Sequence, residues 1–153
     1  MNQEIATFDN ALPVPRSKID AFEDAVNALP KDRQRGPEAF PLKHYVTDNG
    51  LYAREIILPA GTVVVGKVKK EEYISVIADG VVTEVTEAGL QRIKAPYTMV
   101  CKPCTKRIVW THETAVWVTI HSVPPGEDDL DKLYDFVTAS SYEEAERFVE
   151  NLT

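Results

Sequence analysis

Cysteine and histidine are scarce in this chain of 153 residues, which contains two cysteines and three histidines. Two cysteines cannot build the disulfide framework of a small secreted domain, which favours a reducing, cytoplasmic location. Long apolar runs are also missing, because those at residues 56–58 and 63–65 are far below membrane-spanning length. The N-terminus lacks the basic and then apolar pattern of a secretory signal. We therefore expect a cytoplasmic protein that does not act at a membrane.

Basic residues are outnumbered, with 17 Lys and Arg against 24 Asp and Glu and a formal net charge of −7. This balance argues against broad, non-specific binding of nucleic acid. The chain is otherwise of ordinary composition, at 44% hydrophobic and 27% charged residues. Such a composition predicts a folded globular protein, and the length suits a single structural domain.

Composition divides the chain into three regions. Residues 1–50 hold one helix candidate, which Ser17 caps and Pro30 ends. Its apolar stripe consists of Ile19, Phe22, Val26 and Leu29. A charged linker follows at residues 31–41. We predict an N-terminal arm with one helix over residues 1–50.

Residues 51–122 are rich in Val, Ile, Thr, Tyr and Trp, with turn residues about every ten positions. The predicted strands are 52–58, 62–69, 73–78, 81–86, 90–94, 98–101, 106–110 and 115–121. Asp79-Gly80 is the strongest turn signal, because a two-residue type I′ hairpin needs positive φ at both positions. Eight short strands without intervening helices predict a β-sandwich or a small barrel.

Residues 123–153 return to helical spacing. A first helix has the apolar face Leu130, Leu133, Tyr134 and Val137. A second begins at Ser141, which forms a capping box with Glu144. Its buried stripe consists of Tyr142, Ala145, Phe148, Val149 and Leu152. We expect both helices to pack on the barrel.

A known motif spacing lies between Gly61 and Gly80, in the stretch GTVVVGKVKKEEYISVIADG. It resembles the first motif of the cupin superfamily. That motif starts with a glycine, which is followed after five residues by His-x-His. A Glu comes after three or four further residues, and a second glycine ends the motif after six more. The remaining parts of the cupin sequence pattern are matched by residues 51–61, 95–107 and 116–121. Over about residues 45–122 the chain resembles small single-domain cupins encoded by tailed bacteriophages. The resemblance implies a mainly β fold, a cupin-like β-barrel (double-stranded β-helix or jelly roll) with flanking N- and C-terminal helices, and a homodimer.

The resemblance fails at the metal-ligand positions of that motif. Metal-binding cupins place histidines and a carboxylate there, whereas this chain has Lys67, Lys69 and Tyr73. An ammonium group has no lone pair to offer a metal at neutral pH. The second motif has Arg107 or Ile108 where a histidine is expected. We therefore expect no metal, no other cofactor and no metal-dependent oxygenase or isomerase chemistry.

Inward-facing lysines need compensation, because a desolvated ammonium either pairs or loses its proton. A bound anion, exposure at the barrel mouth, or a salt bridge would each supply it. The candidate salt-bridge partners are Glu71, Glu72 and Glu84. The candidate ligand-binding residues are Lys67, Lys69, Tyr73, Arg107 and His121.

A different metal site is an open alternative, built from Cys101, Cys104, His112 and His121. The C-x-x-C spacing occurs in zinc sites and in redox motifs. A zinc site usually has a second pair at comparable spacing, whereas these histidines are nine residues apart. A redox motif starts a helix, whereas this one lies in a predicted turn.

These observations lead to a functional hypothesis. We expect a non-catalytic, metal-free cupin of phage type that binds a small anionic ligand or a host protein, with no catalytic residues assigned. The alternatives are a cupin enzyme, either an epimerase or isomerase or a metal enzyme using His112 and His121, and a virion or assembly component. The place of action would be the host cytoplasm.

Overall fold

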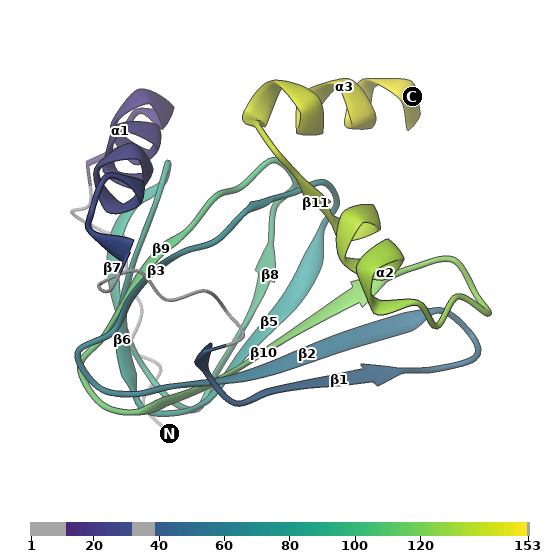
Figure 1. Cartoon of the computed structure of the whole chain (residues 1–153), viewed down its shortest axis with the longest axis horizontal. Helices are drawn as coiled ribbons and strands as arrows, with labels where there is room; N and C mark the ends of the chain where they lie inside the picture. The colour runs from purple at the N-terminus through teal and green to yellow at the C-terminus, as the bar shows by residue number, and fades with distance from the viewer. Residues whose placement is uncertain (1–11, 32–38, 153) are drawn as a thin grey trace.

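The fold is known from a computed structural model, which describes residues 12–31 and 39–152. Within these residues lie three helices and eleven strands (Figure 1). The helices are α1 (Arg16–Asn27), α2 (Leu130–Val137) and α3 (Tyr142–Leu152). The strands are β1 (Leu42–Val46), β2 (Leu51–Leu58), β3 (Val63–Val65), β4 (Val68–Lys69), β5 (Tyr73–Asp79), β6 (Val81–Thr86), β7 (Gly89–Lys94), β8 (Tyr97–Cys101), β9 (Ile108–Thr111), β10 (Ala115–Ser122) and β11 (Thr138–Ala139).

Two antiparallel sheets form the body of the molecule. One has the strand order β1-β2-β10-β5-β8 and the other β3-β9-β6-β7. The chain changes sheet after β2, between β3 and β5 by way of β4, and after β5, β7, β8 and β9, so most consecutive strands lie in different sheets. This alternation is the connectivity of a jelly roll. The mainly β, cupin-like barrel with helices at both ends is confirmed.

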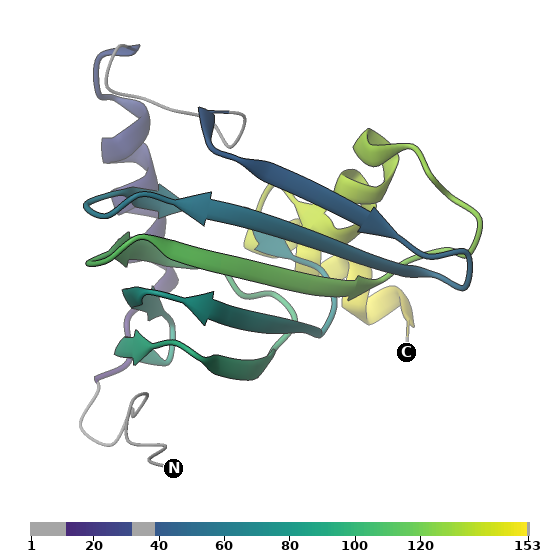
Figure 2. The ribbon, with the colours of Figure 1, turned by 90° about the horizontal axis from the view of Figure 1, so that it is seen from below.

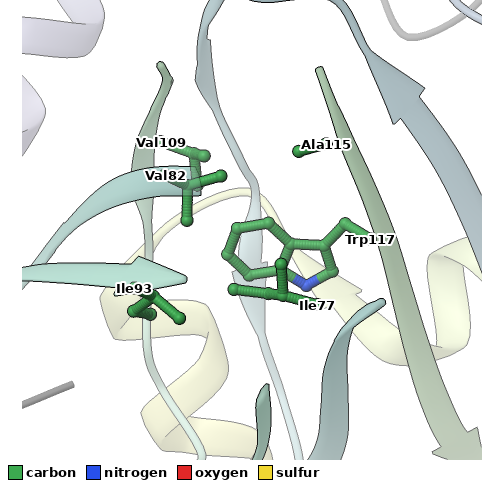
Figure 3. Packing of buried hydrophobic residues seen from close by; sticks show 6 residues of the cluster. All are labelled: Ile77, Val82, Ile93, Val109, Ala115 and Trp117. Atoms are coloured by element: carbon green, nitrogen blue, oxygen red, sulfur yellow. The ribbon is translucent and has the colours of Figure 1, made fainter. Parts of the chain in front are cut away.

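The interior between the sheets is apolar at one end. Because strand side chains alternate between faces, each strand contributes every second residue to it. The buried cluster comprises Ile77, Ala115 and Trp117 from one sheet and Val82, Ile93 and Val109 from the other (Figure 3). We call these six residues the apolar half of the interior.

The C-terminal segment packs against the other end of the barrel. β11 pairs with β4, with Thr138 opposite Lys69 and Ala139 opposite Val68. On α2, Leu133 and Val137 pack with Tyr52 of β2 in a second buried cluster. Tyr142 and Ala145 of α3 are buried with Val68 of β4, so both C-terminal helices lie on the side away from the outer face of the five-stranded sheet (Figure 2).

α1 is joined to the barrel and to α3 by ion pairs. Lys106 Nζ donates to Asp20 Oδ1 at 2.7 Å and to Glu23 Oε1 at 3.0 Å. Arg16 pairs with Glu87 and with Glu146 of α3. Of the predicted stripe of α1 only Ile19 is fully buried. None of the described helices is long and apolar enough to cross a membrane.

Seven of the eight predicted strands are present, with ends within two residues of those predicted. The eighth, 62–69, is interrupted at Gly66-Lys67 and forms β3 and β4. β1 and β11 were not predicted, and β1 pairs with β2, so the sheet begins at Leu42 inside the region assigned to the arm. Capping by Ser141 is confirmed, because its Oγ accepts the Glu144 amide at 3.1 Å. Capping by Ser17 is wrong, since α1 begins after Pro15 without a side-chain cap.

The predicted Asp79-Gly80 hairpin is also wrong. β5 and β6 belong to different sheets, so these two residues turn the chain from one sheet to the other. Gly80 has φ +95°, and a Cβ there would lie 2.4 Å from the Thr114 carbonyl oxygen. Glycine is therefore required by a close backbone approach between sheets rather than by a type I′ turn.

Candidate functional site

The interior changes character along its strands. On β5 the inward residues run from Ile77 through Ser75 to Tyr73, and on β10 they end at His121. Trp117 marks the change, since its Nε1 donates to Ser75 Oγ at 2.9 Å. Beyond this bond the interior is lined by polar and ionisable groups. We call Arg54, Lys69, Tyr73, Glu84, Arg107 and His121 the charged half.

A chain of contacts connects four of these residues. Arg107 donates from Nε to Glu84 Oε2 at 2.9 Å and from a terminal nitrogen to the Tyr73 hydroxyl at 2.8 Å. The Tyr73 ring stacks on His121 with 4.7 Å between centroids. Burial raises the pKa of Glu84, and the Arg107 guanidinium partly offsets this. Burial acts to lower the pKa of Arg107, but Glu84 and Tyr73 outweigh it, so Arg107 and Glu84 form a buried ion pair.

Lys69 has no such partner. The residue is 9% exposed, and among the described residues its side chain makes one hydrogen bond, from Nζ to the Lys67 carbonyl oxygen at 3.2 Å. No carboxylate among the described residues lies within ion-pair distance of it. Burial, followed by the positive charges of Arg54 and Arg107, lowers the pKa of Lys69 to about 7. This amine is therefore poised between its neutral and charged forms near neutral pH.

Lys69 is held in place by backbone pairing on both sides. Its amide donates to the Thr105 carbonyl at 3.2 Å, and its carbonyl accepts the Cys104 amide at 2.8 Å. On the other side it pairs with Thr138 of β11. Cys104 adopts φ 59°, the left-handed conformation, to make its contact. Two segments distant in sequence thus fix the position of one lysine.

Arg54 contributes a second unsatisfied donor. Its Nε is buried and has no hydrogen-bond partner. Its guanidinium lies over the Tyr134 ring of α2, 4.7 Å from the centroid. An unsatisfied buried donor of a charged group is costly, so this Nε is available to a ligand oxygen or to water.

His121 is a neutral imidazole throughout the physiological range. Burial, then the charges of Lys69 and Arg54, lower its pKa to about 3. Its Nε2 lies 3.1 Å from Thr119 Oγ1, and among the described residues no carboxylate bonds to the ring. A general base of the His-Asp type needs such a carboxylate to hold and stabilise its charged form.

A small pocket opens beside His121 at the end of the charged half. It is lined by Glu71, Glu72, His121, Ser122, Phe136 and Val137. Phe136 and Val137 belong to α2, so the C-terminal segment forms one wall of the opening. The other wall is the turn between β4 and β5.

Four of the five candidate ligand-binding residues come together: Lys69, Tyr73, Arg107 and His121. Lys67 is exposed at the edge of this group, and its ammonium lies 5.2 Å from the centroid of the Tyr134 ring, which Arg54 also contacts. Of the candidate counter-charges, Glu84 pairs with Arg107, whereas Glu72 pairs with Lys102 at 4.0 Å on the surface.

Sequence reasoning missed Arg54 and Tyr134. Arg54 lies two residues after Tyr52 on β2 and therefore faces the same interior, which period-two alternation indicates. Tyr134 meets it only through the docking of α2, and no local pattern signals that contact.

The alternative metal site does not assemble. Cys101 and His121 lie in the barrel interior, whereas His112 bonds to Thr83 Oγ1 at 2.7 Å beside Trp110. Cys104 lies on the turn before β9. Over residues 12–31 and 39–152 no three His, Cys, Asp or Glu side chains group as metal ligands would.

Comparison with known proteins shows likeness in fold alone. No family model and no curated protein matches the sequence. Among solved structures, KdgF from Halomonas superposes with TM-score 0.51 and 17% identity, over 63% of this chain and 88% of KdgF. The cupin domain of Schizosaccharomyces pombe Cnp3 gives TM-score 0.49 and 14% identity, over 68% and 72%. An RmlC-like cupin family protein from Methanocaldococcus jannaschii gives 0.48 and 15%, over 66% and 91%. The chain therefore has a double-stranded β-helix fold like that of cupin proteins.

Proposed function

We propose that this protein is a non-catalytic binding protein whose charged half takes up a small anion. One observation carries the proposal: Lys69 is buried beside Arg54 and Arg107 with no carboxylate of its own. A buried ammonium is stable only when paired, so an anion at this position would restore the balance.

The charge count indicates the kind of anion. Arg107 is already paired with Glu84, whereas within residues 12–31 and 39–152 no carboxylate pairs with the guanidinium of Arg54 or the amine of Lys69. Two cations suit a phosphate or a carboxylate group, because both offer several acceptor oxygens. The pocket beside His121 is lined by Glu71 and Glu72 as well as Phe136, so an anion that entered through it would pass two carboxylates.

Binding without turnover is supported by the surroundings of His121. Its lowered pKa, and the absence of a carboxylate partner among the described residues, leave it without the means to act as a general base. The enzymatic alternatives that assign proton abstraction to His121 are therefore not supported by this site.

Calorimetric titration with sulfate tests the proposal, because the charge of sulfate does not change near neutral pH. At pH 6.5 the native protein should bind sulfate, and Lys69→Met should lose at least tenfold in affinity. Lys94→Met is the matched control, since Lys94 is an exposed residue of β7 and loses the same charge. Equal affinity in the native protein and Lys69→Met would refute the anion site.

We also propose that the protein is a homodimer that pairs through the outer face of its five-stranded sheet. That face is uncovered in Figure 2 and carries exposed Ile74 and Val100, at 42% and 62%. Its charged residues Lys43 and Glu55 pair with each other at 3.7 Å. This pair adds no net charge to the face at which two copies, each of net charge −7, would meet.

Sedimentation analysis tests the dimer. The native protein should sediment as a dimer, and Val100→Glu should yield monomers that keep sulfate binding. A native monomer would exclude the dimer, and a monomer that sediments with a bacterial protein would favour a host partner instead. We propose the cytoplasm of a bacterial host as the place of action, which the free Cys101 and Cys104 and the likeness to phage-encoded cupins support.

A further inference from the structure

The amine of Lys69 has chemistry beyond charge pairing. It is the terminal group of a buried side chain whose only hydrogen bond goes to a carbonyl oxygen, so its lone pair is not engaged by a donor. No acid among the described residues holds it in the charged form. Primary amines become nucleophiles in proteins under these two conditions, desolvation and proximity to other cations.

The groups around Lys69 come from every element packed against it. Arg54 of β2, Lys67 beside it, Arg107 before β9 and His121 of β10 are cationic or neutral. Cys101 of β8 acts in the opposite sense, because it raises the pKa of Lys69. With its pKa lowered to about 7, about half of Lys69 is a free amine at neutral pH. An ordinary exposed lysine is neutral on the order of a thousandfold less often.

Arg54 places an acid-binding group next to this amine. Its buried Nε has no partner, and its position is fixed by Tyr134 beneath the guanidinium. A ligand acid group on Arg54 would bring the adjacent carbon of the same ligand toward Lys69.

We propose that Lys69 captures small carbonyl compounds that carry an acid group, such as 2-oxo acids, as a reversible imine. Nζ attacks the carbonyl carbon and forms a C–N bond, giving a carbinolamine. The two protons of the amine then leave with the carbonyl oxygen as one water molecule, and the C=N bond is complete. Nothing is oxidised or reduced, and hydrolysis reverses the step. This inference rests on the proposed anion site and names its ligand class.

Reductive trapping tests the proposal with pyruvate and sodium cyanoborohydride on the full-length protein near pH 7. The reduced adduct adds the mass of pyruvic acid less one oxygen atom, and peptide mapping locates it. The expected result is a saturable adduct at Lys69, formed at least tenfold faster than at exposed Lys94 and slowed by sulfate. Labelling at Lys69 should increase from pH 6 to pH 8, whereas sulfate affinity should decrease over the same range.

Lys69→Arg is the deciding variant, because it keeps the positive charge and cannot form an imine. It should lose the mapped adduct, whereas the matched surface variant Lys94→Arg should keep it. Equal labelling at Lys69 and Lys94 would overturn the imine proposal. If the native protein still bound sulfate, the anion-site proposal would stand. Loss of both sulfate binding and labelling in the native protein would overturn the two proposals together.

Discussion

The two halves of the barrel interior lie on the same strands and differ in almost every physical property. β10 places Ala115 and Trp117 in the apolar half and His121 in the charged half. β5 does the same with Ile77 and Tyr73. The apolar half gains free energy from burial, at about 1.5–3 kcal/mol for each large side chain. The charged half loses free energy by desolvating Lys69 and the Nε of Arg54, for which the described residues supply no carboxylate.

This difference separates stability from function within one barrel. A fold that needed only to be stable would fill both halves with apolar side chains. Unpaired cations in a closed interior are retained where a ligand offsets their cost, and stability and activity then oppose each other. Replacing the unpaired Lys69 of the charged half by an apolar side chain should therefore affect folding in the opposite direction to truncating a side chain of the apolar half.

The largest expected effect belongs to the apolar half. Trp117→Ala removes the largest side chain of that cluster and leaves Ser75 Oγ without its donor. We expect the free energy of unfolding to fall by about 3–5 kcal/mol. Urea denaturation followed by circular dichroism measures it. A loss below about 1 kcal/mol would mean that the apolar half does not carry the stability.

The next largest effect tests the one paired charge of the charged half. Glu84→Gln removes the carboxylate that faces Arg107 Nε at 2.9 Å and leaves a buried guanidinium uncompensated. The expected loss is about 3 kcal/mol. Added sulfate should restore part of it, which a denaturation series with and without sulfate would reveal. No loss would indicate that Arg107 is already neutralised by another group.

Lys69→Met should change stability in the opposite direction. Replacing the unpaired amine by an apolar side chain of similar length should raise the free energy of unfolding by about 1–4 kcal/mol. The same denaturation experiment measures the gain, with Lys94→Met as the surface control. A destabilised Lys69→Met would show that Lys69 is satisfied in the native protein.

The pH dependence of that gain has a defined sign. Lys69 has a pKa of about 7 in the folded chain and 10.5 as its ordinary value, so the unfolded chain binds more protons between these values. Stability of the native protein should therefore rise with pH across this window relative to Lys69→Met. The advantage of Lys69→Met is then greatest at pH 7 and below, and smaller at pH 9.5. A constant difference would show that the pKa of Lys69 is not lowered.

Lys67→Met should have the smallest effect. Lys67 is exposed, and its contact with the Tyr134 ring is worth about 0.5–1 kcal/mol at such a site. A loss within that range, with sulfate affinity reduced less than threefold, is the expected result in denaturation and calorimetry. A loss of sulfate binding equal to that of Lys69→Met would place Lys67 in the site.

Local pattern was sufficient for most of the barrel strands, because alternation and turn residues are visible in the sequence. It failed where a contact is long-range. Gly80 looks like a hairpin residue, yet it passes beneath Thr114 of the other sheet. Lys67 and Lys69 looked equivalent, but the break between β3 and β4 buries one and exposes the other.

The candidate site could likewise be predicted only in part from the sequence. Lys69, Tyr73, Arg107 and His121 follow from the motif spacing and strand alternation. Arg54, whose Nε is unsatisfied, is held in place by Tyr134 of α2, which lies eighty positions later in the chain. Only the docking of the C-terminal segment brings these residues together.

A crystal structure of the native protein grown at pH 6.5 with sulfate tests the central claim most directly. We predict one sulfate in the charged half, within hydrogen-bond distance of Arg54 Nε and Lys69 Nζ. A sulfate-saturated crystal with no anion there, and with the Lys69 side chain turned out to solvent, would contradict it.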